Sequence, residues 1–141
     1  MIRIISIKLT NIYEPTDPGL GVHADERGTI ADIFYNANIN HGCYITSAPE
    51  VVRGNHYHKL TTQYTFITRG VCEYWTQPAD LSTPATMTLL VPGNLAVSEP
   101  YEIHAMRMGK DGCDMIAFAS GPRGGEDYES DTTRVDSIIP L

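Results

Sequence analysis

Residues 53–59 carry the most informative stretch of this chain, Arg-Gly-Asn-His-Tyr-His-Lys, and Gln63 and Gly70 follow it. His56 and His58 are two residues apart in a segment with strand character, so on an extended backbone both side chains leave the same face. Imidazole has the unperturbed pKa nearest neutrality, and two converging imidazoles therefore suit proton transfer, metal ligation or both. A pair of exposed surface histidines is the simpler alternative.

The segments around this stretch have the pattern of short strands separated by glycine and proline turns. Strands are predicted over residues 1–8, 29–35, 43–47, 51–58, 64–68, 71–76, 85–91, 95–98, 103–108 and 113–119. Tight hairpin turns are expected at Gly70 and at Gly112, and a further turn at 25–28. No stretch keeps an apolar period of 3.6 residues over three turns, so little helix is expected. These features predict one all-β domain over residues 1–141, a barrel or jelly roll.

The composition fits one globular domain and excludes some partners. Hydrophobic residues make up 42% of the 141 residues and charged residues 19%, which is enough for one core. The net charge of −7, with only 10 Lys and Arg, argues against general nucleic-acid binding. A phosphorylated small molecule is still a possible ligand, because two or three arginines suffice to bind it.

The three cysteines, Cys43, Cys72 and Cys113, lie far apart in apolar or strand-like surroundings. They are interpreted as buried thiols in a reducing compartment. No secretory leader is evident and no apolar run is long enough to cross a bilayer, so a cytoplasmic protein without a membrane partner is expected.

The spacing of His56, His58, Gln63 and Gly70 resembles the first motif of the cupin superfamily, which places a His-x-His pair, an acidic residue and a glycine on adjacent strands. Gln63 stands where metal-binding cupins usually carry Glu. Residues 99–104, Glu-Pro-Tyr-Glu-Ile-His, resemble the second motif, whose histidine faces the first pair. The resemblance implies a cupin jelly-roll β-barrel in which His104 lies beside His56 and His58.

A second resemblance covers most of the chain and is to the sugar 3,4-ketoisomerases of dTDP-sugar biosynthesis. It rests on four elements in the same order: Asp25-Glu26-Arg27-Gly28, Arg53-Gly54-x-His56-x-His58-Lys59, Gln63, and Glu129-Ser130-Asp131 with Arg134. The first two elements also resemble dTDP-4-dehydrorhamnose 3,5-epimerase, which has a lysine where Gln63 stands here. The resemblance implies a homodimer, often with the amino-terminal strand exchanged, acting on a 4-keto-6-deoxy sugar nucleotide.

Acid/base catalysis without a redox cofactor is the function that this resemblance implies. His56 and His58 are expected to act as base and acid, and Tyr44 to donate to an oxyanion or carry a proton. Paired charge-assisted hydrogen bonds from arginines are expected to hold the diphosphate. The residues expected to bind substrate lie in the motifs quoted above: Arg27, Arg53, Lys59, Gln63 and His104.

Two alternatives stay open at this point. His56, His58, Gln63 and His104 could bind a divalent transition metal such as zinc, because neutral imidazoles suit such ions. The chain could also be a sugar-binding cupin without catalytic activity. The acidic residues 126–131 lack the ligand spacing of a calcium loop and are interpreted as a solvated segment.

Overall fold

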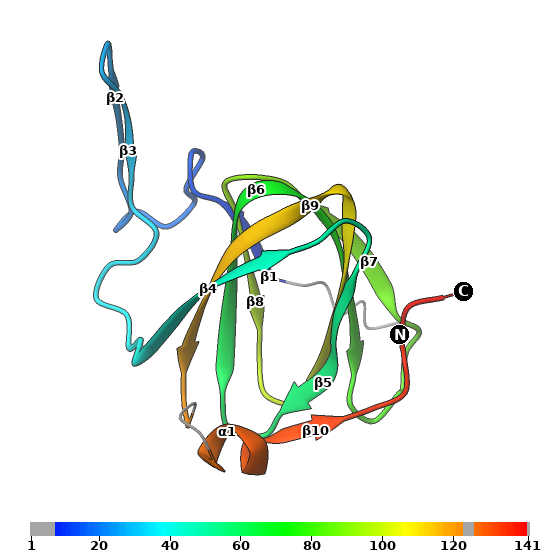
Figure 1. The fold of residues 1–141 in the computed structure, drawn as a ribbon. Coiled ribbons are helices and arrows are strands. Elements are labelled where there is room, and N and C mark those ends of the chain that lie inside the picture. The colour runs from blue at the N-terminus through cyan, green and yellow to red at the C-terminus, as the bar shows by residue number, and fades with distance from the viewer. Residues whose placement is uncertain (1–7, 123–125, 141) are drawn as a thin grey trace.

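The computed structural model describes residues 8–122 and 126–140, which form a β-barrel with one short helix (Figure 1). The elements in chain order are β1 (Lys8–Asn11), β2 (Val22–Asp25), β3 (Gly28–Ala31), β4 (His41–Ser47), β5 (Val52–His58), β6 (Thr62–Pro78), β7 (Thr86–Leu90), β8 (Asn94–Ser98), β9 (Glu102–Ser120), α1 (Glu126–Asp131) and β10 (Thr132–Arg134). The all-β prediction is confirmed. Apart from Lys8, the strand predicted over residues 1–8 lies outside the described residues. Within the described ranges, no helix has the length and apolarity needed to cross a bilayer.

Two long antiparallel strands, β6 and β9, organise the barrel and belong to both of its layers. Their pairing runs from Thr62 opposite Ser120 to Pro78 opposite Glu102. In one layer β8 and β4 flank them, with β1 beyond β8. In the other layer β7 and β5 flank them, with β10 beyond β5. Because β6 and β9 continue from one layer into the other, the strands enclose a single interior.

The hairpin turns predicted at Gly70 and Gly112 are wrong, because both residues lie inside continuous strands. The register of β6 with β9 shifts between Ile67 and Arg69 and again between Gly70 and Cys72. Both glycines have φ near +77°, a conformation that glycine adopts without steric penalty. The first irregularity is a β-bulge with Thr68 as the extra residue, and at the second Val71 lies opposite residues 109–112; at both, the strands pass from one layer into the other. A glycine between two strand-like runs has the same local pattern in a bulge and in a hairpin.

Substitution of Gly70 by alanine is expected to destabilise the barrel by about 2 kcal/mol or more, through steric clash and backbone strain. An added Cβ would lie 2.2 Å from the carbonyl oxygen of Gly112, and backbone at that distance cannot move aside easily. Gly28→Ala is the matched control, since Gly28 also has positive φ but no atom within 4 Å of the added Cβ. Urea unfolding of both variants measures the difference. Equal losses at the two positions would contradict the close approach at Gly70.

The barrel interior is apolar around the two glycine bulges and polar toward the other end of the strands. The apolar part is a cluster of buried side chains: Ile67, Cys72, Tyr74, Leu90, Ala96, Met106, Met108, Cys113 and Met115. The polar part contains buried Gln63, Thr65, Thr76, Ser98, His58 and His104. Cys72 and Cys113 are buried free thiols, as predicted, and Cys43 is half-buried. The polar end is therefore the part of the interior where chemistry can take place.

The hairpin β2–β3 projects away from the barrel, as Figure 1 shows. Its two strands pair with each other, and the predicted turn at 25–28 lies at its tip. β3 ends at Ala31, so the strand predicted over 29–35 is shorter in the structure. We refer to residues 22–31 as the arm.

Candidate active site

Three histidine side chains meet at the polar end of the barrel. His56 and His58 come from β5 and His104 from β9, directly opposite His56. One ring nitrogen of each lies within 4.8 Å of the others, and the ring centroids are 4.6 to 5.6 Å apart. His58 is 2% exposed and His104 1% exposed. The predicted convergence of the three imidazoles is confirmed, and the alternative of exposed surface histidines is wrong.

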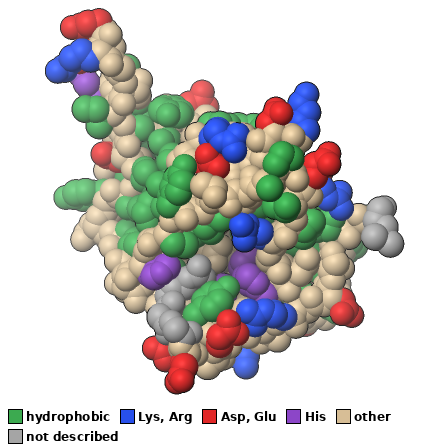
Figure 2. Space-filling model, viewed as in Figure 1, with side chains coloured by type: hydrophobic (Ala, Val, Ile, Leu, Met, Phe, Trp, Pro, Cys, Tyr) green, Lys and Arg blue, Asp and Glu red, His purple; other side chains and the backbone are tan. Residues whose placement is uncertain are grey.

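A cavity of about 170 Å³ opens onto two of these histidines. Its lining residues come from β4, β5, β6, β9 and α1: Ile45, Arg53, Gly54, His56, Gln63, His104, Met106 and Tyr128. Figure 2 shows histidine side chains in a hollow of the face that is viewed, with basic side chains near it. Arg53, Gln63 and His104 therefore share one cavity with His56, and their roles in binding substrate stay predictions.

Arg53 and Gln63 lie on the cavity wall with different partners. The Arg53 guanidinium donates from Nε to Ser47 Oγ at 2.8 Å and from Nη2 to the carbonyl oxygen of Thr46 at 3.1 Å. These bonds hold the guanidinium against the end of β4. The Gln63 side chain is buried, and its Nε2 donates to Thr65 Oγ1 at 3.4 Å. The cavity thus offers a cation and an amide to a polar ligand.

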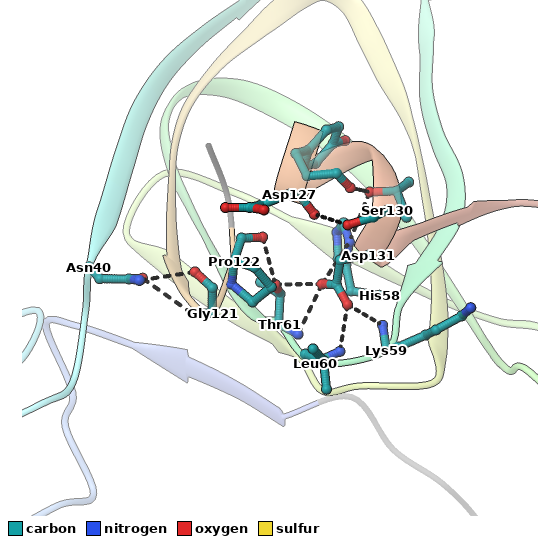
Figure 3. A network of polar contacts seen from close by, with 12 residues as sticks. Asn40, His58, Lys59, Leu60, Thr61, Gly121, Pro122, Asp127, Ser130 and Asp131 are labelled. Carbon is teal, nitrogen blue, oxygen red and sulfur yellow. Dashed lines mark hydrogen bonds and ion pairs between the residues drawn. The ribbon is translucent and has the colours of Figure 1, made fainter. Parts of the chain in front are cut away.

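Asp131, at the end of α1, is a buried carboxylate that organises the loop after β5 (Figure 3). Its Oδ1 accepts hydrogen bonds from the backbone N–H groups of Lys59 and Leu60 at 3.1 and 2.8 Å. Its Oδ2 accepts from the Thr61 backbone N–H at 3.2 Å and from Thr61 Oγ1 at 2.6 Å. The side chain is 2% exposed. The interpretation of residues 126–131 as a solvated segment is therefore wrong for Asp131.

The same carboxylate also approaches His58. Asp131 Oδ2 lies 3.9 Å from His58 Nδ1, and Thr132 Oγ1 lies 3.3 Å from that nitrogen. Burial acts to raise the pKa of Asp131, but the hydrogen bonds from Thr61, Leu60 and Lys59 and the attraction of His58 together hold that pKa below its ordinary value. The ionised carboxylate therefore lies beside the Nδ1 edge of the His58 ring and helps to orient it.

Tyr128 is a cavity residue that the sequence did not point to. It lies on α1, its ring centroid is 5.7 Å from that of His58, and its side chain lines the cavity. The hydroxyl of Thr132 donates to the Tyr128 carbonyl oxygen at 2.6 Å, which holds the last turn of the helix against β10. Its place depends on the carboxyl-terminal segment folding back over the barrel end, and no local pattern encodes that return.

Three of the predicted site residues lie away from this cavity within one chain. Tyr44 is 62% exposed on the outward face of β4, where exposed and inward positions alternate. Arg27 is at the tip of the arm, 81% exposed, and its Nη2 donates to Asp25 Oδ2 at 2.6 Å. Lys59 is exposed just after β5. The catalytic role of Tyr44 stays a prediction that its outward position does not support.

A further acidic residue, Glu102, lies at the start of β9 next to the polar interior. Burial, with a smaller contribution from Glu99, raises the pKa of Glu102 to about 7, against an opposing effect of Lys8. Its Oε1 is buried and accepts no hydrogen bond from any residue in the described ranges. The charged form is therefore less favourable in the folded chain than in the unfolded one.

Glu102→Gln is expected to stabilise the protein at pH 8 and to have little effect at pH 4.5. The raised pKa means that the folded chain holds the proton more tightly, so stability falls as pH rises from the ordinary value of 4.5 to about 7 and the penalty is complete above that. We expect a gain of about 1 to 2 kcal/mol at pH 8, because solvent screens part of the effect. Urea unfolding at the two pH values checks this. A gain of the same size at both would contradict it.

Comparisons with known proteins find similarity in structure. The sequence matches no protein-family model and no curated protein. The sugar 3,4-ketoisomerase QdtA from Thermoanaerobacterium thermosaccharolyticum, solved in complex with TDP, aligns with a TM-score of 0.70 and 21% identity over 92% of this chain and 88% of that chain. A 3,4-ketoisomerase from Helicobacter canadensis aligns with a TM-score of 0.74 and 20% identity, over 94% and 92% of the two chains.

A third similar structure has a related activity. The dTDP-4-dehydrorhamnose 3,5-epimerase from Sulfolobus tokodaii aligns with a TM-score of 0.71 and 17% identity, over 97% of this chain and 86% of that chain. At these identities the comparisons concern the fold. With the strand order and the histidine cluster described above, they show that this chain has the cupin-type jelly-roll fold of the dTDP-sugar 3,4-ketoisomerases and 3,5-epimerases.

Proposed function

We propose that the protein is a nucleotide-sugar isomerase that acts on a dTDP-linked 4-keto-6-deoxyhexose, as a 3,4-ketoisomerase or an epimerase. The observation that carries the proposal is the convergence of His56, His58 and His104 beside a cavity that also presents Arg53. The fold shared with enzymes of this class supports it. Gln63, in the place of the epimerase lysine, favours ketoisomerisation over 3,5-epimerisation.

His56 is the proposed base, because it is the member of the His-x-His pair that lines the cavity. The 4-keto group acidifies the proton on C3. His56 removes that proton, and the electron pair of the C–H bond moves toward the C4 oxygen to form an enediolate. The Gln63 amide, which lines the cavity with His56, can donate a hydrogen bond to the developing oxyanion. Transfer of the C3 hydroxyl proton to the C4 oxygen, followed by return of a proton to C4, completes isomerisation, whereas return of a proton to the other face of C3 gives epimerisation.

Incubation with dTDP-4-keto-6-deoxyglucose in deuterated water tests the proposed reaction. Deuterium is expected at C4 of an isomerised product, or at C3 of an epimerised one, and NMR of the recovered sugar nucleotide measures both. His56→Asn is the control and should incorporate little deuterium. Saturable binding without incorporation at either carbon would leave a sugar-binding module as the function.

Arg53 and Arg27 are proposed to bind the diphosphate, with Arg27 supplied by a second copy of the chain. Arg53 lines the cavity, whereas Arg27 is carried away from it on the arm. An isolated two-stranded hairpin is marginally stable in water, and the exposed Ile30 and Val22 on the arm give a partner an apolar surface. In a homodimer, each arm would reach the cavity of the partner. Arg27 would then lie near the partner's diphosphate site, and the partner would cover the exposed Ile30 and Val22.

Mixing two inactive variants, Arg27→Ala and His56→Asn, tests this exchange. If the arm acts on the partner, a hybrid dimer has one complete site, and random reassembly should restore about a quarter of the wild-type activity. If Arg27 acts within its own chain, every site in the mixture lacks either Arg27 or His56. If subunit exchange is verified and no activity is restored, Arg27 does not act on the cavity of the partner.

The second candidate function is that of a metal-dependent cupin. It is favoured by one observation, the three imidazoles whose nitrogens lie within 4.8 Å of one another. His56, His58 and His104 would hold an ion such as zinc, with Gln63 as a weak fourth ligand, and the ion would act as a Lewis acid. Metal analysis of protein purified without nickel resin or added metal tests it. Stoichiometric metal, and activity lost to a chelator and regained with zinc, would favour this candidate over the metal-free one.

A further inference from the structure

The pairing of β5 with β9 contains one extra residue on β5, at Asn55. Arg53 pairs with Met106 and His56 pairs with His104. Met106 and His104 are two residues apart and both face the cavity, but their partners Arg53 and His56 are three residues apart. Residues three apart on a regular strand leave opposite faces. The register shift between Gly54 and His56 is therefore what brings Arg53 and His56 to the same face.

The backbone of this bulge has a conformation that few residues tolerate. Gly54 has φ +91° and Asn55 has φ +58°. A Cβ at Gly54 would lie 2.6 Å from the carbonyl oxygen of His104, which explains why only glycine fits there. Asparagine is among the few residues with a side chain that enter the left-handed region readily, whereas a β-branched residue at Asn55 would be strained.

Residues 135–140, which we call the tail, donate hydrogen bonds to both oxygen atoms of Asn55. The backbone carbonyl oxygen of Asn55 accepts from the Val135 N–H at 2.9 Å, and its side-chain Oδ1 accepts from the Ile138 N–H at 2.9 Å. The tail continues from β10, which lies beside β5 in Figure 1, and Ile139 is buried. The extra residue is thus anchored from outside the barrel by a segment about 80 residues away in the sequence.

We propose that Asn55 is a positioning residue that, anchored by the tail, holds the bulge so that His56 and Arg53 face one cavity. Without the anchor the bulge is free to relax or shift along β5, and one of the two side chains turns out of the cavity. Asn55 itself touches neither substrate nor cavity and acts through its neighbours. The catalytic consequence rests on the proposed function, but the placement of His56 does not depend on it.

Three substitutions of Asn55 separate the effect of its side-chain acceptor from the effect of its tolerance of positive φ. Asn55→Asp keeps both the side-chain acceptor and the tolerance of positive φ. Asn55→Gly keeps the tolerance but loses the acceptor, and Asn55→Val loses both. Asn36→Val is the matched control, because Asn36 also has positive φ (+54°) but lies in an exposed loop away from the cavity. The control measures the effect of backbone strain alone on stability.

The test is the imidazole nitrogen spectrum of the folded protein, recorded by NMR at one pH with the His56 signal assigned from His56→Asn. We expect the wild-type His56 signal in Asn55→Asp and Asn36→Val, and a shifted or broadened His56 signal in Asn55→Gly and Asn55→Val. The turnover of the keto sugar should fall about tenfold or more in the last two. If Asn55→Val does not fold, Asn55→Gly still decides.

Two results would overturn the positioning role. One is a wild-type His56 signal in Asn55→Gly, and the other is a change of that signal in Asn55→Asp as large as that in Asn55→Gly. The spectrum is read without substrate. A wild-type protein that never turns over the keto sugar would therefore count against the proposed reaction alone, because the His56 signal still reports on the bulge.

Discussion

The turnover of the dTDP-linked keto sugar is expected to fall by about 10²- to 10⁴-fold when His56 is replaced by asparagine, the range that removal of a general base produces. His56 is the residue of the His-x-His pair that lines the cavity, and its ring centroid is 4.6 Å from the ring centroid of His104. Asparagine is smaller and polar but cannot accept a proton near neutral pH. Single-turnover kinetics, with dTDP affinity measured in parallel, separates a lost base from lost binding.

Tyr44→Phe is the companion variant for that experiment. Tyr44 lies on the outer face of β4, so its phenylalanine variant should keep turnover within about twofold of the wild type, the range expected where no reacting group is lost. A large loss in Tyr44→Phe would restore the catalytic role that the sequence suggested for it. Turnover above a tenth of the wild-type value in His56→Asn would instead place the base on another side chain, and His58→Asn would then be the next variant to measure.

Replacement of Asp131 by alanine is expected to lower the free energy of unfolding by about 3 kcal/mol or more, because the buried donors of Thr61 and the part-buried N–H of Leu60 lose their acceptor. The carboxylate accepts from the N–H groups of Lys59, Leu60 and Thr61 and from the Thr61 hydroxyl. These bonds close the loop that joins the His58 strand to the Gln63 strand. Thermal and urea unfolding measure the loss.

Asp127→Ala is the matched control for this variant, because Asp127 is an exposed aspartate on the same helix. It should change stability by less than about 0.5 kcal/mol. Asp131→Asn should fall between the two, since it keeps one acceptor oxygen and loses the charge. Similar stabilities for Asp131→Ala and Asp127→Ala would show that the hydrogen bonds in Figure 3 contribute little.

The pH dependence of stability provides a second test of the stabilisation by the Asp131 carboxylate. Its pKa is lowered in the folded chain, so its stabilisation is fully present above the unfolded value of 3.8 and is lost as pH falls through the lower folded pKa. The wild type should therefore lose more stability than Asp131→Asn when unfolding is compared between pH 5 and pH 3. Parallel curves over that interval would assign the acid sensitivity to other carboxylates.

Local patterns predicted the strands well, because side-chain alternation and glycine or proline turns are local properties. β4, β5, β7 and β8 are close to their expected ranges. The interpretation failed at Gly70 and Gly112, where a bulge and a hairpin turn look alike over four residues. Long-range pairing decides between them, and β6 with β9 form one continuous ladder on both sides of the glycines.

The site residues also divide into those that local patterns predicted and those that long-range contacts decided. His56, His58, Gln63 and His104 were identifiable because period-two spacing and motif order survive in the sequence. Tyr128 could not be found so, and the motif that contains Asp131 gave that residue no role, because the carboxyl-terminal segment brings both beside His58 from about 70 residues away.

The sequence by itself determined an all-β barrel with converging histidines, since extended backbone places alternate side chains on one face wherever the strand lies. Only the tertiary structure decided which other groups meet those histidines. The bulge at Asn55 turns Arg53 to the face of His56, and the tail holds that bulge. Helix α1 brings Asp131 to His58, and the arm carries Arg27 away from the cavity of its own chain. These outcomes depend on contacts between distant segments, and no local pattern of residues specifies such contacts.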